Sequence, residues 1–350
     1  MIRRGFISAI LFASLATSGI AQTNVTLNMQ VGGKTRNCVV HVPTGTTKPP
    51  LVFFIHGANG SGAGLQSETK ANTTADREKF IAAFPSATSN GATGTWDDMM
   101  GTGNFPFFLA VIDTLAARYQ IDRNRIYMTG FSQGGFISFQ AGCMFSDVFA
   151  AIAPVSGHVS TTTCAIKRPV PVFMTFGASE GAASFLKDLD LWLKLDKCPS
   201  TSTIVRPYPA SNPNSKAVRV GYGPCESGSS VVMDSIQGQG HQWPSTNNLN
   251  QADEVWNFFK QYSLTGTTAV HEQNIVLGRV SFSLDYSAGM LRLGGIGEEA
   301  RVRITDTKGR LIANSAASRR EFDLQGQPGG IYLVSVTGSA GSLARKFLIP

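Results

Sequence analysis

The residues best suited to chemistry surround a serine in the pentapeptide Gly130-Phe-Ser132-Gln-Gly134. Glycines two residues before and two residues after a serine often occur by chance, but this motif follows a predicted strand (126–129) and opens a predicted helix (136–143). A tight strand-to-helix turn holds the hydroxyl at the carboxyl edge of a sheet, where the positive end of the helix favours negative charge. The pattern predicts Ser132 as a nucleophile, and a glycine-rich packing turn is the alternative.

A serine hydroxyl attacks only when a base removes its proton, so a histidine is needed downstream. The histidines that follow Ser132 are His158, His241 and His271. After a nucleophile of this kind the chain order is nucleophile, acid, histidine, and His241 lies where this order requires, between the last predicted strand and the closing helix. We predict His241 as the general base, because His158 comes too early and His271 falls in a predicted linker.

A carboxylate must orient the imidazole and stabilise its charged form. Glu180 is the first carboxylate after the predicted strand 170–176. Asp188 and Asp190, in a predicted amphipathic helix, and Asp234, on the last predicted strand, remain alternatives. We favour Glu180 as the acid, because the acid is expected on the loop that follows the end of a strand.

The negative oxygen of an acyl-transfer intermediate needs two backbone N–H donors. One is expected from Gln133, the residue after the nucleophile, and the other from the loop after the apolar run 51–55. That loop, 56–62, is rich in glycine, so its backbone can approach a substrate closely. We predict the N–H of Ala58 or Asn59 as the second donor, and a plain surface turn is the alternative.

Two tryptophans near these motifs, Trp96 and Trp243, are candidates to flank an aromatic acyl group or a sugar. Packing in the core is an equal alternative, because tryptophan buries a large area in either case. No pair of cysteines or group of histidines has metal-ligand spacing. We therefore expect no metal and no cofactor.

The elements that must position these residues form two patterns. From residue 25 to 256, apolar strands alternate with helical stretches, which predicts an α/β domain with a mostly parallel sheet over 22–263. A polar, glycine-containing linker is expected at 264–276. Short alternating strands with glycine turns then predict a small all-β sandwich over 277–350.

The five cysteines fit an exported protein with disulfides and one unpaired thiol. Pairing Cys143 with Cys164 and Cys198 with Cys225 would close short loops beside the proposed site and leave Cys38 free on an early strand. Other connectivities remain open, because the sequence alone does not fix them.

The first residues are typical of a secretory signal. Arg3 and Arg4 precede a short apolar run, and small residues follow at a plausible cleavage point, so we expect residues 1–21 to be removed. No segment reaches the length of a membrane-spanning helix. The formal charge of +7 is spread along the chain without a basic stripe, which argues against nucleic acid as a partner.

Residues 30–262 resemble the polyhydroxybutyrate-depolymerase-like esterases, a group that includes bacterial feruloyl esterases and some acetylxylan esterases of carbohydrate esterase family 1. The resemblance rests on His56-Gly57 and on the blocks LAARYQID (115–122), RIYMTGFSQGG (125–135) and GHQWP (240–244). It implies an α/β-hydrolase fold and identifies His241 as the catalytic histidine. The family usually has aspartate where this chain has Glu180.

The resemblance also implies a substrate and a destination. It favours a secreted feruloyl esterase acting on plant cell-wall xylan esters, with acetylxylan esterase and polyhydroxyalkanoate depolymerase as alternatives. An inactive hydrolase scaffold that binds polysaccharide is the alternative from another class. Residues 302–310, 328–334 and 346–349 resemble the β-sandwich sorting domains of type IX secretion, which implies contact with secretion machinery and release or attachment at the cell surface.

Overall fold

The structure is a computed structural model, and it describes most of the chain. The described residues are 23–88, 91–159, 164–245, 249–267, 283–287, 290–294, 301–306, 310–316, 320–328, 330–338 and 341–349. The predicted signal (1–21) and His271 lie outside them. Within the described part of the chain, no helix is long and apolar enough to cross a membrane.

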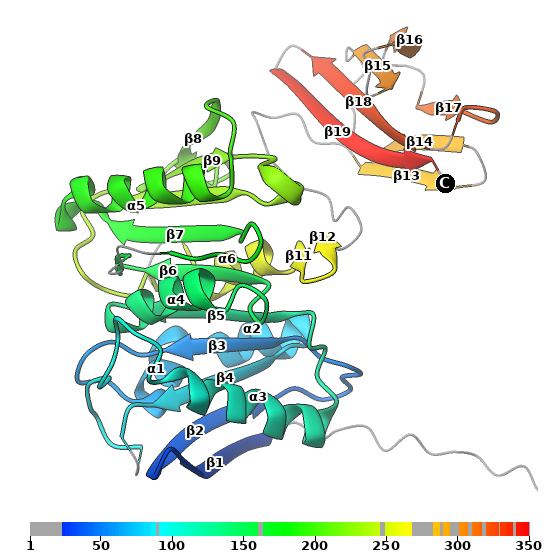
Figure 1. Ribbon diagram of the computed structural model, residues 1–350. Helices are drawn as coiled ribbons and strands as arrows, with labels where there is room; N and C mark the ends of the chain where they lie inside the picture. The colour runs from blue at the N-terminus through cyan, green and yellow to red at the C-terminus, as the bar shows by residue number, and fades with distance from the viewer. Residues whose placement is uncertain are drawn as a thin grey trace, which may run out of the picture.

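A ten-stranded sheet forms the first domain, in the order β1-β2-β4-β3-β5-β6-β7-β10-β9-β8 (Figure 1). Its central strands, from β4 to β10 in this order, are parallel to one another. They are β4 (Ile81–Ser86), β3 (Leu51–Ile55), β5 (Ile126–Phe131), β6 (Ala151–Val155), β7 (Val172–Gly177) and β10 (Val231–Ile236). Antiparallel strands extend both sides: β1 (Thr23–Val31), β2 (Lys34–Val42), β9 (Ala217–Tyr222) and β8 (Ser202–Tyr208). The carboxyl ends of the parallel strands therefore share one edge.

Helices cover both faces of this sheet. They are α1 (Gly62–Thr69), α2 (Ala71–Glu78), α3 (Phe105–Tyr119), α4 (Gln133–Met144), α5 (Ala182–Leu195) and α6 (Gln251–Phe259). Residues of α3, α4 and α5 belong to one apolar core and residues of α1, α2 and α6 to the other; Figure 1 shows α3, α4 and α5 in front of the sheet. In β3, Phe53 and Ile55 enter the first core while Val52 and Phe54 enter the second, so both faces of the strand are apolar, as a covered parallel strand requires.

The layered, mostly parallel architecture confirms the predicted fold class. Two local details differ from what the residue pattern suggests. Residues 77–84 have the pattern of a helix running into a short strand that Pro85 ends; in the structure α2 ends at Glu78, and Pro85 lies inside β4 opposite Cys38 of β2. Periodicity also did not reveal β6, because Ala151–Val155 is a short apolar run with a proline and no alternation.

Two disulfides join Cys143 to Cys164 and Cys198 to Cys225, which confirms the predicted pairing. Cys38 is free and fully buried in β2. Burial raises the pKa of the Cys38 thiol above its usual range, because a thiolate would lose its hydration there. This thiol therefore stays protonated and unreactive.

The C-terminal region contains two small antiparallel sheets. One has the order β13-β14-β17 and the other β16-β15-β18-β19. Their bounds are β13 (Ser283–Ser287), β14 (Met290–Gly294), β15 (Arg301–Asp306), β16 (Leu311–Ala316), β17 (Glu321–Asp323), β18 (Gly330–Gly338) and β19 (Gly341–Ile349). Both sheets contribute to one apolar core, which includes Leu291, Phe322, Val302 and Val334, so a separate small β domain forms as predicted.

The boundaries between the parts remain a prediction. The proposed linker, 264–276, starts inside a short hairpin, in which β11 (Tyr262–Ser263), just before the linker, pairs with β12 (Gly266–Thr267). The rest of that linker, from 268, lies outside the described residues.

A buried ion network ties the antiparallel edge of the sheet to α6. Arg219 on β9 stands opposite Asp234 on β10, and its Nε and Nη2 lie 2.7 Å and 2.6 Å from the two carboxylate oxygens. The same Nη2 lies 2.9 Å from Glu254 of α6, and the guanidinium is 3.6 Å from the ring centre of Tyr208. Asp234 has no exposed surface, so its charge is balanced only by this arginine.

Asp234→Asn should therefore lower the free energy of unfolding by about 3 kcal/mol, because the Arg219 guanidinium, whose side chain is only 21% exposed, loses one of its two carboxylates. Urea unfolding followed by circular dichroism measures the change. Asp113→Asn is the matched control: its pair with Arg123 is exposed, so we expect a loss below about 1 kcal/mol. Equal losses in the two variants would contradict this account.

Candidate active site

Ser132 occupies the sharp turn between β5 and α4. Its φ of 56° is in the left-handed region, and its N–H donates to the carbonyl of Val155 in β6 (2.9 Å). The flanking glycines are needed because the main chain is crowded here. A β-carbon at Gly134 would lie 1.9 Å from the carbonyl oxygen of Ile55, and one at Gly130 would lie 2.5 Å from that of Gly134. The motif thus has a steric reason, and it places the serine at the carboxyl edge of the sheet.

The structure brings Ser132, His241 and Glu180 together from three loops at this edge. His241 follows β10, and its Nε2 lies 2.9 Å from Ser132 Oγ. Glu180 ends a single 3₁₀ turn (Ala178–Glu180) after β7, and its Oε2 lies 2.5 Å from His241 Nδ1. A carboxylate can only accept, so Nδ1 carries the proton and Nε2 is left to accept one from the serine. This arrangement can transfer a proton away from Oγ as the oxygen attacks.

Glu180 and His241 differ in their exposure to solvent. The Glu180 side chain is 11% exposed, whereas that of His241 is 51% exposed and open to solvent. Glu180 Oε1 accepts from the N–H of Gly177 (2.9 Å) and from the hydroxyl of Ser156 (2.8 Å). The centre of the Phe131 ring lies 4.8 Å from the centre of the His241 imidazole ring.

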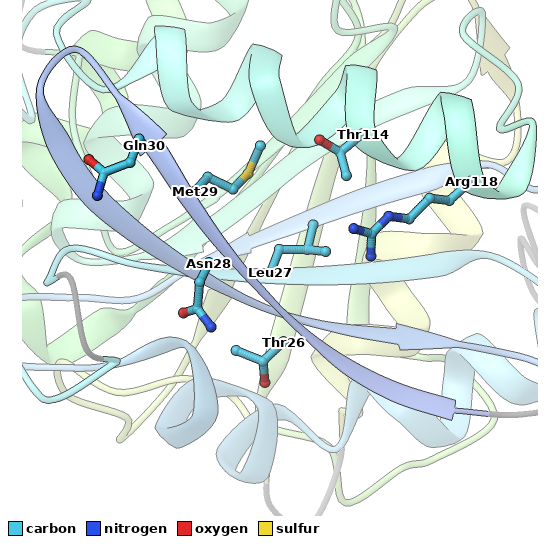
Figure 2. A pocket seen from close by; sticks show the side chains of 7 residues that line it. All are labelled: Thr26, Leu27, Asn28, Met29, Gln30, Thr114 and Arg118. Atoms are coloured by element: carbon cyan, nitrogen blue, oxygen red, sulfur yellow. The ribbon is translucent and has the colours of Figure 1, made fainter.

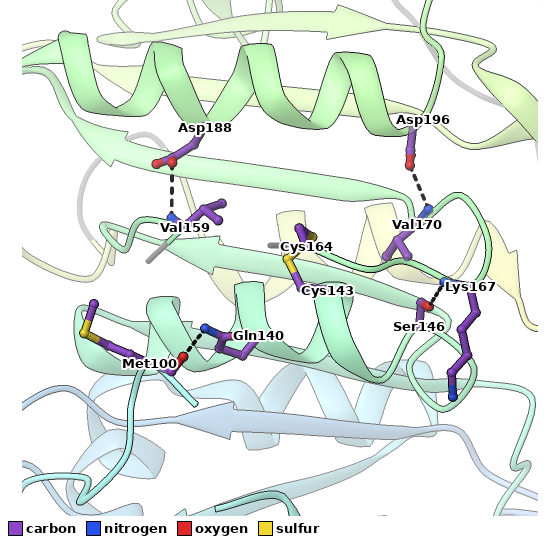
Figure 3. The surroundings of a disulfide bond; sticks show 10 residues. All are labelled: Met100, Gln140, Cys143, Ser146, Val159, Cys164, Lys167, Val170, Asp188 and Asp196. Atoms are coloured by element: carbon purple, nitrogen blue, oxygen red, sulfur yellow. Dashed lines mark hydrogen bonds between the residues drawn. A yellow bond between two sulfur atoms is a disulfide. The ribbon is translucent and has the colours of Figure 1, made fainter. Parts of the chain in front are cut away.

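The other carboxylates considered as acids have different partners. Asp188, on α5, accepts from the Val159 N–H (3.1 Å) beside the Cys143–Cys164 disulfide, as Figure 3 shows. It also lies 2.8 Å from Nδ1 of His158. Asp190 is exposed on α5, and Asp234 is paired with Arg219. None of these three contacts His241.

The glycine-rich loop lies directly against the nucleophile. A β-carbon at Gly57 would be 3.1 Å from the β-carbon of Ser132. Asn59 has a φ of 56°, and its N–H donates to the Thr95 hydroxyl (3.4 Å), which leaves Ala58 as the better-placed donor in this loop. Gln133 begins α4, so its N–H has no acceptor inside the helix.

His56, not singled out from the sequence as a functional residue, fixes this loop. It is buried, and burial lowers the pKa of its imidazole. The neutral ring donates from Nδ1 to the carbonyl of Gly57 (2.7 Å) and accepts at Nε2 from the N–H of Ala87 (3.0 Å). Its position directly before Gly57 was the available signal, whereas its partner 31 residues away was not visible in the sequence.

Of the two roles considered for Trp96 and Trp243, substrate contact and packing in the core, their burial agrees with packing. Trp96 is 3% exposed, stacks on His56, and donates from its indole N–H to the His56 carbonyl (2.9 Å). Trp243 is 2% exposed and packs in the core near Phe54. Both indoles therefore pack inside the protein, and neither ring is exposed enough to stack on a ligand.

A hollow of about 550 Å³ lies away from these residues (Figure 2). Its lining comes from β1 and α3: Thr26, Leu27, Asn28, Met29, Gln30, Thr114 and Arg118. In the order of the sheet, β2, β4 and β3 separate β1 from β5, which carries the nucleophile. Among the described residues, no group of three or more histidine, cysteine, aspartate or glutamate side chains could hold a metal ion.

Family models match two parts of the chain. Residues 88–182, which include Ser132 and Glu180, match the prolyl oligopeptidase family of α/β-hydrolases. Residues 281–350 match the secretion system C-terminal sorting domain. This second match confirms the expected sorting domain and indicates secretion or attachment at the cell surface.

Several characterised proteins are similar to the first domain. A bifunctional acetylxylan esterase/xylanase of Neocallimastix patriciarum is 31% identical over 242 residues, which cover 67% of this chain and 34% of that protein. Feruloyl esterase B of Piromyces equi is 25% identical over 264 residues, 65% of this chain and 46% of that protein. The chain thus spans about a third and about half of these relatives.

A solved acetyl xylan esterase from Aspergillus awamori has the same fold, with a TM-score of 0.53 and 17% identity. The alignment covers 68% of this chain and 98% of that one. Fold, sequence relatives and family models agree. The chain is an α/β-hydrolase related to acetylxylan and feruloyl esterases, and residues 281–350 form a secretion sorting domain.

Proposed function

We propose that the chain is a secreted serine carboxylic-ester hydrolase with Ser132 as nucleophile, His241 as general base and Glu180 as the acid that orients the imidazole. One observation carries the proposal. An unbroken hydrogen-bonded path leads from Ser132 Oγ through the His241 ring to the Glu180 carboxylate, at the edge of the sheet where the loops meet. A nucleophile, a base and a group that orients the base are what acyl transfer requires.

The reaction proceeds in two halves. Ser132 Oγ attacks the ester carbonyl carbon while His241 Nε2 takes the hydroxyl proton, and the carbonyl oxygen becomes negative. The N–H groups of Gln133 and Ala58 donate to that oxygen, and each such donor stabilises the transition state by about 3 kcal/mol. The intermediate collapses, His241 gives its proton to the leaving alcohol, and the acyl group stays on Ser132. Water, deprotonated by His241, then releases the acid in the same way and restores the serine.

We propose plant cell-wall polysaccharide esters as the substrate class, with feruloyl esters on xylan as the favoured member. The relatives support this choice, since they are named for acetylxylan and feruloyl esters. Export through the sorting domain agrees with a polymeric substrate outside the cell. Acetylated xylan and hydroxyalkanoate polyester are the alternative substrates.

The test is a parallel assay of wild type and Ser132→Ala with an aryl acetate, a feruloylated xylan fragment, acetylated xylan and a polyester. Wild type should hydrolyse the aryl acetate, and Ser132→Ala should lose about 10⁴-fold or more in kcat, because the nucleophile is gone. The fastest natural substrate identifies the acyl group. Equal slow turnover by both proteins would remove Ser132 from the mechanism and favour the polysaccharide-binding scaffold instead.

Glu180→Gln should lower kcat for the same aryl acetate by about 10²- to 10⁴-fold, because a neutral amide does not stabilise the imidazolium. Asp188→Asn is the matched control, because Asp188 lies on α5 and has His158 and Val159 as its partners. Its kcat should stay within about twofold of wild type, as expected for a residue outside the reacting group. A large loss in Asp188→Asn with an active Glu180→Gln would reassign the acid.

The loops that carry Glu180 and His241 touch at Gly177. A β-carbon there would lie 2.4 Å from the carbonyl oxygens of both Gln239 and Gly240, so Gly177→Ala must push the His241 loop away. We expect kcat to fall by about 100-fold, the effect of displacing a catalytic group by about an ångström. Gly221→Ala, whose β-carbon meets only ordinary contact at 3.9 Å, should keep wild-type kcat. Wild-type turnover in Gly177→Ala would show that this contact is not needed.

A further inference from the structure

The two oxygens of the Glu180 carboxylate have separate partners. Oε2 faces the His241 ring, and Oε1 accepts from two donors on the other side, the Gly177 N–H at 2.9 Å and the Ser156 hydroxyl at 2.8 Å. The Gly177 donor belongs to the same short turn as Glu180, whereas Ser156 comes from a different strand end, β6. Apart from His241 itself, Ser156 is therefore the only side chain, among the described residues, that contacts this carboxylate from outside its own loop.

Ser156 is itself firmly held. It is 4% exposed, its φ is 50°, and its N–H donates to the carbonyl of Thr175 in β7 (2.8 Å). The next residue, Gly157, lies against the first turn of α4, where its β-carbon would be 2.6 Å from the α-carbon of Gly135. The Ser156 hydroxyl is thus fixed between the strand that precedes Glu180 and the helix that follows the nucleophile.

A glutamate needs such a support more than an aspartate does. Its side chain has one more rotatable bond, and the last torsion, which turns the carboxylate plane, has a broad and shallow preference. A single donor on Oε1 allows the plane to turn about that contact, whereas two donors from different directions fix it. With the plane fixed, Oε2 is kept in line with Nδ1 of His241.

We propose that Ser156 is a positioning residue for the triad, whose hydroxyl fixes the Glu180 carboxylate so that Oε2 remains directed at His241. The inference rests on the proposed function, since it assigns Ser156 a role in that reaction. Without the hydroxyl, the carboxylate plane can turn about the Gly177 contact, and the hydrogen bond from His241 Nδ1 to Oε2 loses its alignment.

The charges around Glu180 are few, which makes this effect measurable. His241 is its only charged or titratable partner among the described residues. The next titratable pair at this edge is His158 with Asp188, and those two side chains contact each other and not Glu180. A change at Ser156 therefore reaches the base through Glu180.

The test compares Ser156→Ala and Ser156→Gly with Ser138→Ala in the full-length protein. Alanine has the same backbone preference as serine at this φ, and glycine relieves it, so loss of fold does not hide the result. Ser138 is a buried serine of α4 whose hydroxyl donates only to the Gly134 carbonyl, which makes it the matched control. The first readout is the proton NMR signal of His241 Nδ1–H, which needs no turnover.

Both Ser156 variants should shift that NMR signal and lower kcat for the aryl acetate by about tenfold with KM unchanged. Ser138→Ala should match wild type in both measurements. In a Glu180→Gln background, Ser156→Ala should lower kcat no further. An unmoved NMR signal, or an equal loss of kcat in both backgrounds, would overturn the proposal. An inactive wild type with a shifted NMR signal would instead refute the esterase function and leave the positioning role supported.

Discussion

The structure depends on one close approach of main chain to main chain, where the first turn of α4 lies against the end of β3. There is no space for a side chain at Gly134, because the carbonyl of Ile55 fills it. This contact allows the chain to turn sharply from β5 into α4 at Ser132. The positive φ of Ser132 costs on the order of 1–3 kcal/mol for a residue other than glycine. The neighbouring strand and helix hold it there, so the strain is balanced by the packing of the sheet.

The parallel sheet brings together residues that are far apart in the sequence. The serine and the histidine are 109 residues apart, yet each follows a strand whose carboxyl end reaches the same edge. Both faces of the sheet are covered by apolar cores, so the strands that carry the site cannot slide relative to one another without disturbing either layer. Rigid strands and short loops together hold the three polar groups at hydrogen-bonding distances.

The sequence was most informative where chemistry and chain order coincide. The residues predicted as nucleophile, base and acid lie together, because a motif with a steric cause and a fixed order of elements constrain them. The contacts by which His56 fixes its loop and Ser156 reaches Glu180 were not evident, since these partners are distant in the chain and β6 has no periodic signal. The sequence left two roles open for Trp96 and Trp243, because nearness to a motif in the sequence does not say which way a ring points; the structure shows both rings buried.

The disulfides have a consequence for where this hydrolase can mature. The Cys143–Cys164 disulfide joins Cys164 to α4, the helix that begins directly after Ser132. A bridge of this loop length contributes about 3 kcal/mol, and it forms only in an oxidising compartment. The chain therefore completes its own scaffold after it leaves the reducing cytoplasm, and Cys38, sealed in β2, cannot compete for either bond once the sheet has closed.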